Sequence, residues 1–348
     1  MPIQPNFLER VTFFTLNAAP TPMLDLAGAL GYQALSTAVH LNLFETLHKR
    51  PLTATELAQT LNCQERGIAN LLKALSGIGY VVETNGTYRN TPMTEKWYLD
   101  GTMLDLKNAV TCWDAFLRDL WPHAPTVIQS GERPFNFYDY TAEKPGLSHA
   151  HQQMMYSSAN MNGRDVVNRV KLPAGPTRLL DVGGGHGAYT IHFCQAYPNL
   201  QATILDSEIA LETAEQHVDA AGLNGRIKRQ PADIWQMDWG ADYDLILLCN
   251  FIHHYDVETN IKLLHKAHAA LRPGGQVAIF DQLESKQIGS AISGLFQLIN
   301  LMYYLFADGR IFSRDEVRQM LDTANFSNAQ FYSTPKWAGQ SLVTAVRE

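Results

Sequence analysis

The chain has 348 residues, 46% of them hydrophobic and 18% charged, so it can bury sizeable cores and is long enough for two domains. A formal net charge of −7 and a pI near 5.9 argue against a sequence-blind nucleic-acid binder, because neutralising phosphates demands clustered lysine and arginine. The four cysteines lie far apart without a CxxC pair, which argues against a disulfide framework or a zinc site and favours a reduced, cytoplasmic setting.

The N-terminal third of the chain has a helical pattern. Residues 1–14 lack a basic segment followed by a long apolar run, so no signal peptide is expected. Residues 31–47 carry large apolar side chains at helical spacing, which predicts a first helix across this stretch. These side chains are Leu35, Val39, Leu43 and Leu47.

Two further helices are expected after this one. Thr53 and Glu56 match a capping box, in which the hydroxyl caps the first turn and the carboxylate reaches back to the free amide. The next helix has one apolar face and two glycines at its end. Its face consists of Ile68, Leu71, Leu72 and Leu75, and the glycines are Gly77 and Gly79.

A hairpin follows these helices. Two short strand-like runs flank Asn85 and Gly86, a dipeptide that tolerates the positive φ angles of a tight turn. Three helices and a hairpin make a winged helix, a fold that can bind DNA. The third helix carries only Arg66 and Lys73 as basic residues, with Glu65 against them, so we interpret the region as a structural or dimerising winged helix.

The middle of the chain changes character twice. Residues 100–175 are helical in pattern and rich in large side chains, most of which we expect in a core. Residues 131–146 interrupt these helices with proline and glycine and are interpreted as a surface loop. From Thr177 onward strand patterns alternate with helical patterns, which indicates a parallel sheet covered on both faces.

A long and almost uncharged run at residues 288–306 raises the question of a membrane span. The run contains four polar residues and has no basic flank, which favours a buried helix that lines a pocket or a subunit interface. The polar residues are Ser290, Ser293, Gln297 and Asn300. We therefore expect no membrane association.

A glycine turn joins the first strand of the predicted sheet to a helix that begins near Ala188. Glycines at positions 183, 184, 185 and 187 would let the backbone approach a ligand, and the helix N-terminus offers unpaired amides. Gly183, Gly185 and Ala188 also satisfy the GxGxxA form of the dinucleotide fingerprint, which is a weak signal by itself. An ordinary tight turn without a ligand is the alternative.

Three carboxylates accompany these glycines. Asp181 stands two residues before the first glycine, Asp206 ends the next strand, and Asp233 follows a third. A carboxylate at a second-strand end accepts both hydroxyls of a ribose, and one after the third strand can take the exocyclic amine of adenine. The set predicts a pocket for adenosine. The group that is attached to the adenosine and lies over the glycines need not be phosphate.

Residues 177–284 resemble the core of an S-adenosylmethionine-dependent methyltransferase. With the winged helix in front, the whole chain resembles the small-molecule O-methyltransferases of the plant caffeic-acid and bacterial natural-product type. The most specific parts of the resemblance are residues 34–47, 53–75 and 181–190.

The resemblance implies a two-domain architecture and a homodimer. We expect a winged-helix dimerisation domain at residues 1–110, a helical connection at 111–175 that contributes to the substrate pocket, and a doubly wound, Rossmann-like α/β methyltransferase domain at 176–348. In this family the N-terminal domain dimerises, and one subunit helps to close the substrate pocket of the other.

The resemblance also implies where S-adenosylmethionine binds. The implied cofactor-binding residues are Asp181, Gly183, Gly185, Asp206, Asp233, Ile234 and Asn250. Among them the glycines would contact the methionine portion, the carboxylate at 206 the ribose, and residues 233 and 234 the adenine. Cys249 stands where plant members carry a lysine near the cofactor.

Two adjacent histidines, His253 and His254, fall just past the end of the predicted fourth strand, at the edge where doubly wound sheets bind ligands. An imidazole can take the proton of a hydroxyl at neutral pH. By resemblance His253 is the general base, and His254 occupies an acidic position. Plant members flank the base with two carboxylates; the equivalents here are Asp281, after the fifth strand, and the apolar Ile311.

Two other interpretations of the histidines remain. A Mg²⁺ site wants clustered oxygen ligands, whereas adjacent histidine side chains diverge, so no metal is predicted. Alternatively, both histidines pack or cap the following helix without a chemical role.

An apolar pocket rich in aromatic side chains would suit a flat phenolic or polyketide-like acceptor. Candidates to line it are Trp113, Phe116, Met154, Met155, Asn300, Met302, Tyr303 and Phe306. Met302 and Phe306 match lining positions in the family, and with Trp113 and Met155 they form the predicted substrate-binding set.

The predicted function is O-methylation of a small aromatic or polyketide-like secondary metabolite, with His253 as base and Asp281 orienting it. The alternatives are a C- or N-methyltransferase on the same scaffold, and a non-methylating enzyme or sensor that only binds S-adenosylmethionine.

Overall fold

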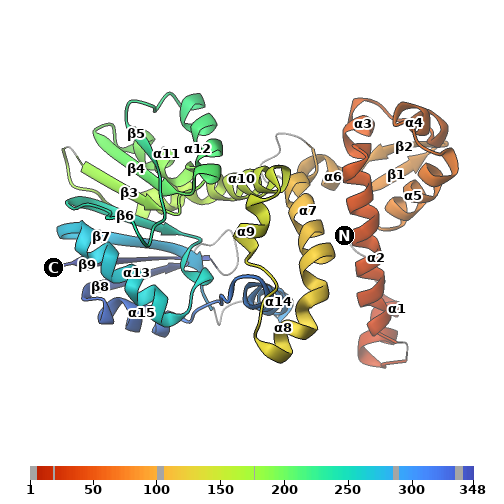
Figure 1. The fold of residues 1–348 in the computed structure, drawn as a ribbon. Helices are drawn as coiled ribbons and strands as arrows, with labels where there is room; N and C mark the ends of the chain where they lie inside the picture. Colours follow the sequence, from red (N-terminus) through yellow and green to blue (C-terminus); the bar gives the residue numbers. More distant parts are fainter. Residues whose placement is uncertain (1–5, 19, 100–105, 176, 285–289, 334–339) are drawn as a thin grey trace. The chain divides into compact units, whose positions relative to one another are not determined.

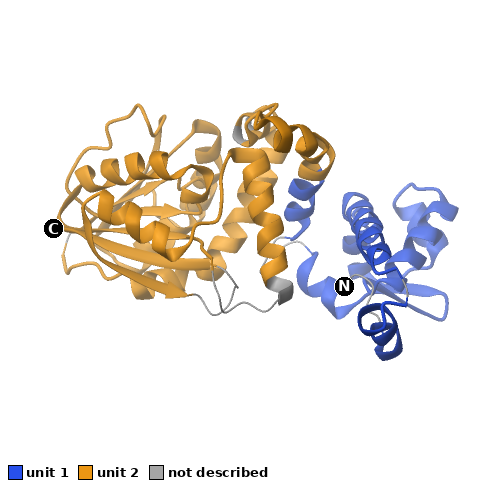
Figure 2. Cartoon of the chain, turned by 90° about the horizontal axis from the view of Figure 1, so that it is seen from below, with its two compact units in different colours: residues 1–114 blue, residues 115–348 orange. Residues whose placement is uncertain are grey.

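The computed structural model describes residues 6–18, 20–99, 106–175, 177–284, 290–333 and 340–348. The chain divides into two compact units, residues 1–114 and 115–348, which Figure 2 distinguishes by colour. The helices of the expected connection, residues 111–175, fall almost entirely within the second unit.

The first unit is a set of helices with one small hairpin. Its elements are α1 (Phe7–Arg10), η1 (Val11–Thr15), α2 (Pro22–His40), α3 (Leu43–Lys49), α4 (Ala54–Thr60), α5 (Glu65–Gly77), β1 (Val81–Thr84), β2 (Thr87–Asn90) and α6 (Pro92–Trp97), and α7 (Leu106–Ala115) ends at its boundary. The strands pair antiparallel around Asn85 and Gly86, both of which have positive φ. The predicted hairpin is therefore confirmed.

The predicted capping box is also present, because the Thr53 hydroxyl accepts the amide of Glu56 while the Glu56 carboxylate accepts the amide of Thr53. The prediction of one helix over residues 31–47 is wrong. Asn42 adopts a left-handed conformation with φ 53°, which ends α2 and starts α3 in a new direction. Leu35, Val39, Leu43 and Leu47 are nevertheless buried in one core.

Large apolar side chains are exposed on the first helical segments of this unit. They are Phe7, Leu8, Phe14, Leu16, Met23, Leu26 and Leu30. Exposed apolar side chains in such number are typical of a surface that another protein chain covers.

The second unit begins with helices and continues as an α/β sheet. The helices are η2 (Phe116–Leu120), η3 (Trp121–His123), α8 (Ala124–Ser130), α9 (Phe137–Ala142) and α10 (Pro145–Arg169). Residues 131–146 are thus not a continuous loop as predicted, because α9 forms within them. Within this short helix, Phe137 stacks on Phe116 and Tyr140 stacks on Phe135. These ring contacts stabilise the helix.

The central sheet has seven strands. In chain order they are β3 (Thr177–Val182), β4 (Leu200–Asp206), β5 (Ile227–Pro231), β6 (Tyr243–Cys249), β7 (Leu271–Gln282), β8 (Phe326–Ser333) and β9 (Gln340–Arg347), and in space the order is β5-β4-β3-β6-β7-β9-β8. The first five strands are parallel, and β9 runs antiparallel to both neighbours. The strand order reverses between β3 and β6, the position at which sheets of this kind bind ligands.

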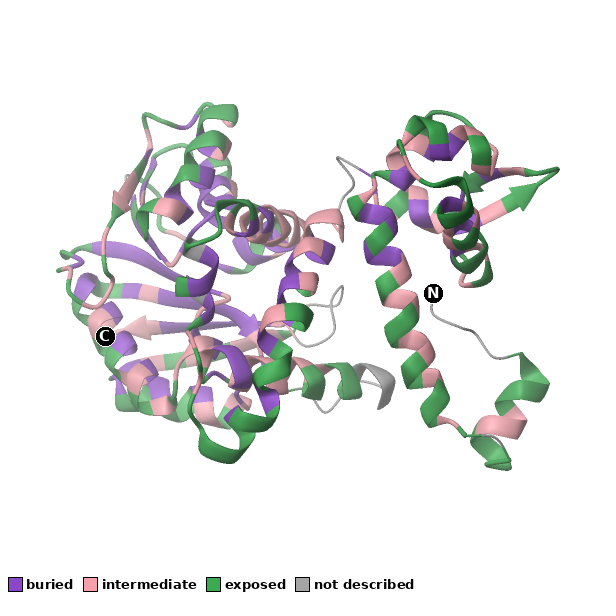
Figure 3. Ribbon diagram, turned by 45° about the vertical axis from the view of Figure 1, so that its right-hand side comes forward, coloured by how far each residue is buried: buried purple, intermediate pink, exposed green. Residues whose placement is uncertain are grey.

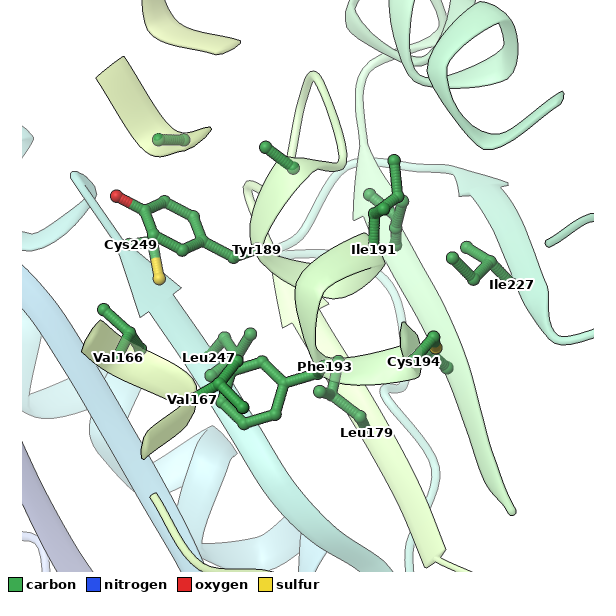
Figure 4. Close-up of a cluster of buried hydrophobic side chains, with 14 of the residues drawn as sticks. Val166, Val167, Leu179, Tyr189, Ile191, Phe193, Cys194, Ile227, Leu247 and Cys249 are labelled. Carbon is green, nitrogen blue, oxygen red and sulfur yellow. The ribbon is translucent and has the colours of Figure 1, made fainter. Parts of the chain in front are cut away.

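Helices cover both faces of this sheet (Figure 1). On one face α10, α11 (Ala188–Ala196) and α12 (Glu208–Ala220) contribute to a buried cluster, and on the other α13 (Val257–Ala270) and α15 (Arg314–Thr323) do so. Figure 3 shows buried residues concentrated along the strands, and Figure 4 shows Phe193 beside Val167 and Leu247 in the first cluster. The predicted doubly wound architecture is confirmed.

The apolar run at 288–306 forms helix α14 (Ser290–Ala307). Among its described side chains, Leu295 is 54% exposed and Leu298 58%, whereas Leu305 and Phe306 are buried. The C-terminal end of the helix thus packs on a core of the chain, and the exposed leucines are compatible with the predicted place at a subunit interface. In the described parts of the chain, no helix is both long and apolar enough to cross a membrane.

We predict that Thr53→Ala lowers the free energy of unfolding by about 1 kcal/mol, because it removes the side-chain cap of α4. Thr60→Ala is the matched control, since its exposed hydroxyl bonds only the helix carbonyl of Glu56. Chemical denaturation followed by circular dichroism measures both changes. Equal losses for the two variants would contradict the capping role.

Candidate active site

The glycine loop follows β3 and leads into α11, as predicted. Gly183, Gly185 and Gly187 all have positive φ, and Gly187 directly precedes the first residue of the helix, Ala188. The amide of Gly183 donates to the carbonyl of Leu205 at 2.8 Å, which ties the start of the loop to the neighbouring strand β4.

Two side chains that the sequence did not single out press on this loop. A Cβ atom at Gly183 would overlap the ring of Phe251, and one at Gly185 would lie 2.9 Å from Oε1 of Gln152 on α10. The glycines are thus required by close approach as well as by their φ angles. Gln152 and Phe251 come from segments far from the loop in sequence, so no local pattern could have identified them.

Asp206 ends β4 and faces the loop. Its Oδ2 accepts the amide of Gly185 at 2.8 Å, and its Oδ1 accepts the amide of Ser207 at 2.7 Å. Burial raises the pKa of this carboxyl above its usual value, while the two amide bonds oppose that shift. The carboxylate that ends the second strand therefore lies directly against the glycine loop, and its predicted contact with a ribose stays a prediction.

Asp233 and Ile234 follow β5. The Asp233 carboxylate accepts the amide of Trp235 and the side chain of Gln236, each at 2.8 Å, and it is exposed to solvent. Ile234 packs against the core cluster beneath α13. One exposed carboxylate and one apolar side chain at the end of β5 are suited to an adenine edge and an adenine face.

Asp181 lies beneath the glycine loop and is 1% exposed. Thr190 donates to its Oδ2 at 2.6 Å, whereas its Oδ1 has no hydrogen-bond partner among the described residues. Burial, with a smaller contribution from the charge of Asp206, raises the pKa of Asp181 to about 7. An unpartnered buried acceptor under a glycine cradle fits a ligand whose amines lie over the loop.

Asn250 and Cys249 end β6 beside this cradle. Asn250 has a left-handed backbone with φ 50°, and its amide donates to the carbonyl of Phe280 at 2.7 Å. Cys249 packs into the core cluster with Tyr189 of α11. The chain therefore places a small buried thiol, and no ammonium group, at the position where the resemblance implied a lysine.

His253 lies in the short helical turn η4 (Ile252–His254) that follows β6, and it is 5% exposed. Its Nδ1 lies 2.6 Å from Oδ1 of Asp281. Asp281 is the second-last residue of β7 and is completely buried. Because a carboxylate can only accept, Nδ1 carries the hydrogen, and Nε2 of the neutral ring keeps its lone pair. The predicted orientation of His253 by Asp281 is thus a direct contact.

Asp281 also builds the turn that carries the histidine. Its Oδ2 accepts the backbone amides of Phe251 at 3.0 Å and His253 at 3.3 Å, and its Oδ1 accepts the amide of Gln282. The same carboxylate therefore positions both the backbone and the imidazole of the candidate base.

His254 has a different environment from His253. Burial lowers the pKa of His254 well below its usual value, and the neighbouring His253 and His151 add to the shift. His254 is neutral at physiological pH for this reason, so it does not replace the negative charge that its position implied. The centre of its ring lies 3.9 Å from the centre of the His253 ring.

Aromatic rings from four segments, α14, η2, α9 and α10, lie in a row in this unit and form what we call the aromatic wall. Phe306 of α14 stacks on Phe116 at 5.0 Å, Phe116 stacks on Phe137 at 4.8 Å, and Phe137 meets the edge of His151 at 5.3 Å. Burial lowers the pKa of His151 to about 4, so this ring is also neutral. The sequence did not single out Phe137 or His151, because only tertiary packing joins them to Phe306.

The four predicted substrate-binding residues have different surroundings. Phe306 belongs to the aromatic wall, and Met302 lies one turn before it on α14, half-buried. Met155 is half-buried on α10, three positions after Gln152. Trp113 lies in the first unit, so its role in the pocket stays a prediction.

Two family models match the chain. A model described as an O-methyltransferase domain matches residues 123–327, and one described as an O-methyltransferase dimerisation domain matches residues 25–100. The second match supports the predicted homodimer.

Individual proteins resemble the chain over most of its length. The 3-hydroxy-5-methyl-1-naphthoate 3-O-methyltransferase of Streptomyces sahachiroi is 27% identical, covering 94% of this chain and 95% of that protein. The L-tyrosine C(3)-methyltransferase of Streptomyces lavendulae is 26% identical, covering 94% of each. The solved structure of the S-adenosylmethionine-dependent methyltransferase SibL is 26% identical with a TM-score of 0.69, covering 92% of this chain and 97% of that one.

We predict that Asp181→Asn raises the free energy of unfolding of the cofactor-free protein by about 3 kcal/mol at pH 8 and by much less at pH 5. The folded protein binds a proton on Asp181 that the unfolded chain has released between pH 4 and pH 7. The native stability therefore falls as the pH rises through that window and stays low above it, whereas the amide has no charge to bury.

Urea unfolding at the two pH values measures this difference, and Thr190→Val serves as the control that removes the hydrogen-bond donor but keeps the carboxyl group. A stability change in Asp181→Asn that is the same at pH 5 and pH 8 would show that the carboxyl does not titrate in this range.

Proposed function

The chain belongs to the O-methyltransferase family and is an S-adenosylmethionine-dependent methyltransferase, and we propose that it methylates a hydroxyl of a small aromatic or polyketide-like metabolite with His253 as general base. The observation that carries this proposal is the buried contact between Nδ1 of His253 and Asp281, which leaves Nε2 free as a proton acceptor. His253 lies just beyond β6, the strand that pairs with β3 and its glycine loop, and the reacting groups would meet there.

The residues around the glycine loop would hold the cofactor. Gly183 and Gly185 would lie against its methionine portion, the Asp206 carboxylate would accept the ribose hydroxyls, and Asp233 with Ile234 would contact the adenine. The open acceptor on Asp181 and the side chain of Asn250 lie at the same edge. When bound, S-adenosylmethionine supplies a methyl group on a positively charged sulfur.

The chain's own contribution to the reaction would be removal of a proton and shaping of the pocket. Nε2 of His253 would take the hydroxyl proton of the acceptor as its oxygen bonds to the methyl carbon. The positive charge that develops on the imidazole lies against the Asp281 carboxylate, which holds the ring in one orientation. The aromatic wall from Phe306 to Phe137 would pack against a flat acceptor.

C-methylation is the second candidate function, because one relative of comparable identity is named as a C-methyltransferase of L-tyrosine. Methylation of a phenol ring beside its hydroxyl also benefits from loss of the phenolic proton, so the same base would serve both reactions. The two products differ in whether the free hydroxyl is retained, which NMR of the product distinguishes.

A binding and turnover experiment tests the function directly. We expect calorimetry to show binding of S-adenosylmethionine, and a mass screen of phenolic and polyketide-like acceptors to show products that have gained one methyl group. Binding without a methylated product from any of these acceptors would contradict the proposed substrate class.

The roles of the two histidines are tested by substitution. We predict that His253→Ala lowers the methylation rate by about 10²- to 10⁴-fold, the usual contribution of a general base, while the affinity for S-adenosylmethionine is nearly unchanged. His254→Ala is the matched control, and it should cost far less because the ring that the Asp281 carboxylate orients is that of His253. If both substitutions are equally harmful, or both harmless, the assignment of the base is wrong.

A further inference from the structure

The candidate base, His253, has a carboxylate at only one of the two positions that carry carboxylates in the plant members that the chain resembles. Position 311 carries a buried isoleucine whose amide donates to Oδ1 of Asn300 at 2.7 Å. Asp281 alone therefore supplies negative charge to His253 from these two positions. Asp281 contacts the edge of the imidazole at Nδ1, so contacts to the face of the ring have to come from another residue.

Tyr303 of α14 occupies that face. Its ring lies 4.1 Å from the ring of His253 with an angle of 16° between the planes, which is a parallel stack. Its hydroxyl is 3.3 Å from Oε1 of Gln282, the residue that follows Asp281 on β7. The tyrosine is therefore fixed at both ends, by the imidazole that it covers and by the strand that carries the orienting carboxylate.

The turn after α14 also grips the backbone of His253. The amide of Arg310 donates to the carbonyl oxygen of His253 at 3.0 Å, and the amide of Gly309 donates to the carbonyl of Tyr303 at 3.2 Å. A Cβ atom at Gly309 would overlap the same His253 carbonyl, so only glycine permits this close approach. Residues 303–310 thus hold both the ring and the backbone of the base.

We propose that Tyr303 is a positioning residue for His253, which stabilises the protonated imidazole through its ring face and takes the part of the missing second carboxylate. This inference rests on the proposed function, because it assigns a partner to the same base. An aromatic face attracts a cation, and the attraction is strongest where water is excluded, as it is around His253.

The other groups around the imidazole are compatible with this role. Asp281 approaches from β7, His254 from the next position in the chain, and Tyr303 from α14. Burial raises the pKa of the Tyr303 phenol and lowers that of His254, so both are neutral when His253 receives a proton. The stack therefore adds an attractive ring without adding a competing charge.

Three variants of the full chain separate the ring from the hydroxyl and from general effects on α14. Tyr303→Phe keeps the ring and loses the bond to Gln282, whereas Tyr303→Leu loses both. Tyr304→Leu is the matched control, because it removes a tyrosine ring from the adjacent position, where Arg133 rather than His253 lies over it.

The first readout is the pH profile of the methylation rate. We expect Tyr303→Leu to lower the plateau rate about tenfold, the size of a partly desolvated cation–π contact, and to move the acid limb to lower pH because the imidazolium has lost a stabilising partner. Tyr304→Leu should keep both the plateau and the acid limb, whereas Tyr303→Phe, which keeps the ring and loses only the bond to Gln282, should lose much less of the plateau rate than Tyr303→Leu. The same plateau and limb in Tyr303→Leu as in Tyr304→Leu would overturn the inference.

The second readout does not depend on activity. The ring protons of His253, identified by their loss in the NMR spectrum of His253→Ala, should lie upfield in the native protein because they are stacked on a tyrosine. They should move downfield in Tyr303→Leu and stay near their place in Tyr303→Phe. Unchanged signals in Tyr303→Leu would overturn the stack itself, whereas a fully active His253→Ala would instead overturn the proposed base.

Discussion

The bond between Nδ1 of His253 and the wholly buried carboxylate of Asp281 is the interaction on which the rest of the site depends. The carboxylate also accepts the amides of Phe251 and His253. One side chain therefore both closes the turn after β6 and orients the imidazole of His253. A buried carboxylate without these partners would be costly, so the turn, the ring orientation and the end of β7 stabilise one another.

The sheet topology brings this turn next to the glycine loop. β3, which carries the glycines, pairs with β6, which carries the histidines, at the position where the strand order reverses. Phe251 extends from the turn to Gly183, where a Cβ atom would overlap its ring. The glycine loop and the turn that carries His253 thus touch through one aromatic side chain.

The sequence was sufficient for the parts of the fold that local patterns specify. The hairpin at Asn85 and Gly86, the capping box at Thr53, the strand end at Asp206 and the place of His253 just past β6 depend on neighbours within a few residues, and all are found as predicted. The break at Asn42 was missed, because apolar spacing continues across it while the backbone conformation does not.

Contacts between distant segments could not be predicted in the same way. Gln152 reaches the glycine loop from α10, His151 joins the aromatic wall through Phe137, and Tyr303 stacks on a histidine fifty positions earlier in the chain. No periodicity or motif connects these residues. The sequence predicts Tyr303 only as a residue that lines the pocket, whereas the structure places its ring against His253.

The central claim is that His253 removes the proton of the acceptor hydroxyl beside the cofactor. A crystal structure of the protein with S-adenosylhomocysteine and a methyl acceptor tests this most directly. The account predicts the acceptor oxygen within about 2.6–3.2 Å of Nε2 of His253, on the side of the ring away from Asp281. An acceptor oxygen that faces His254 instead, or that has no histidine within hydrogen-bond reach, would contradict it.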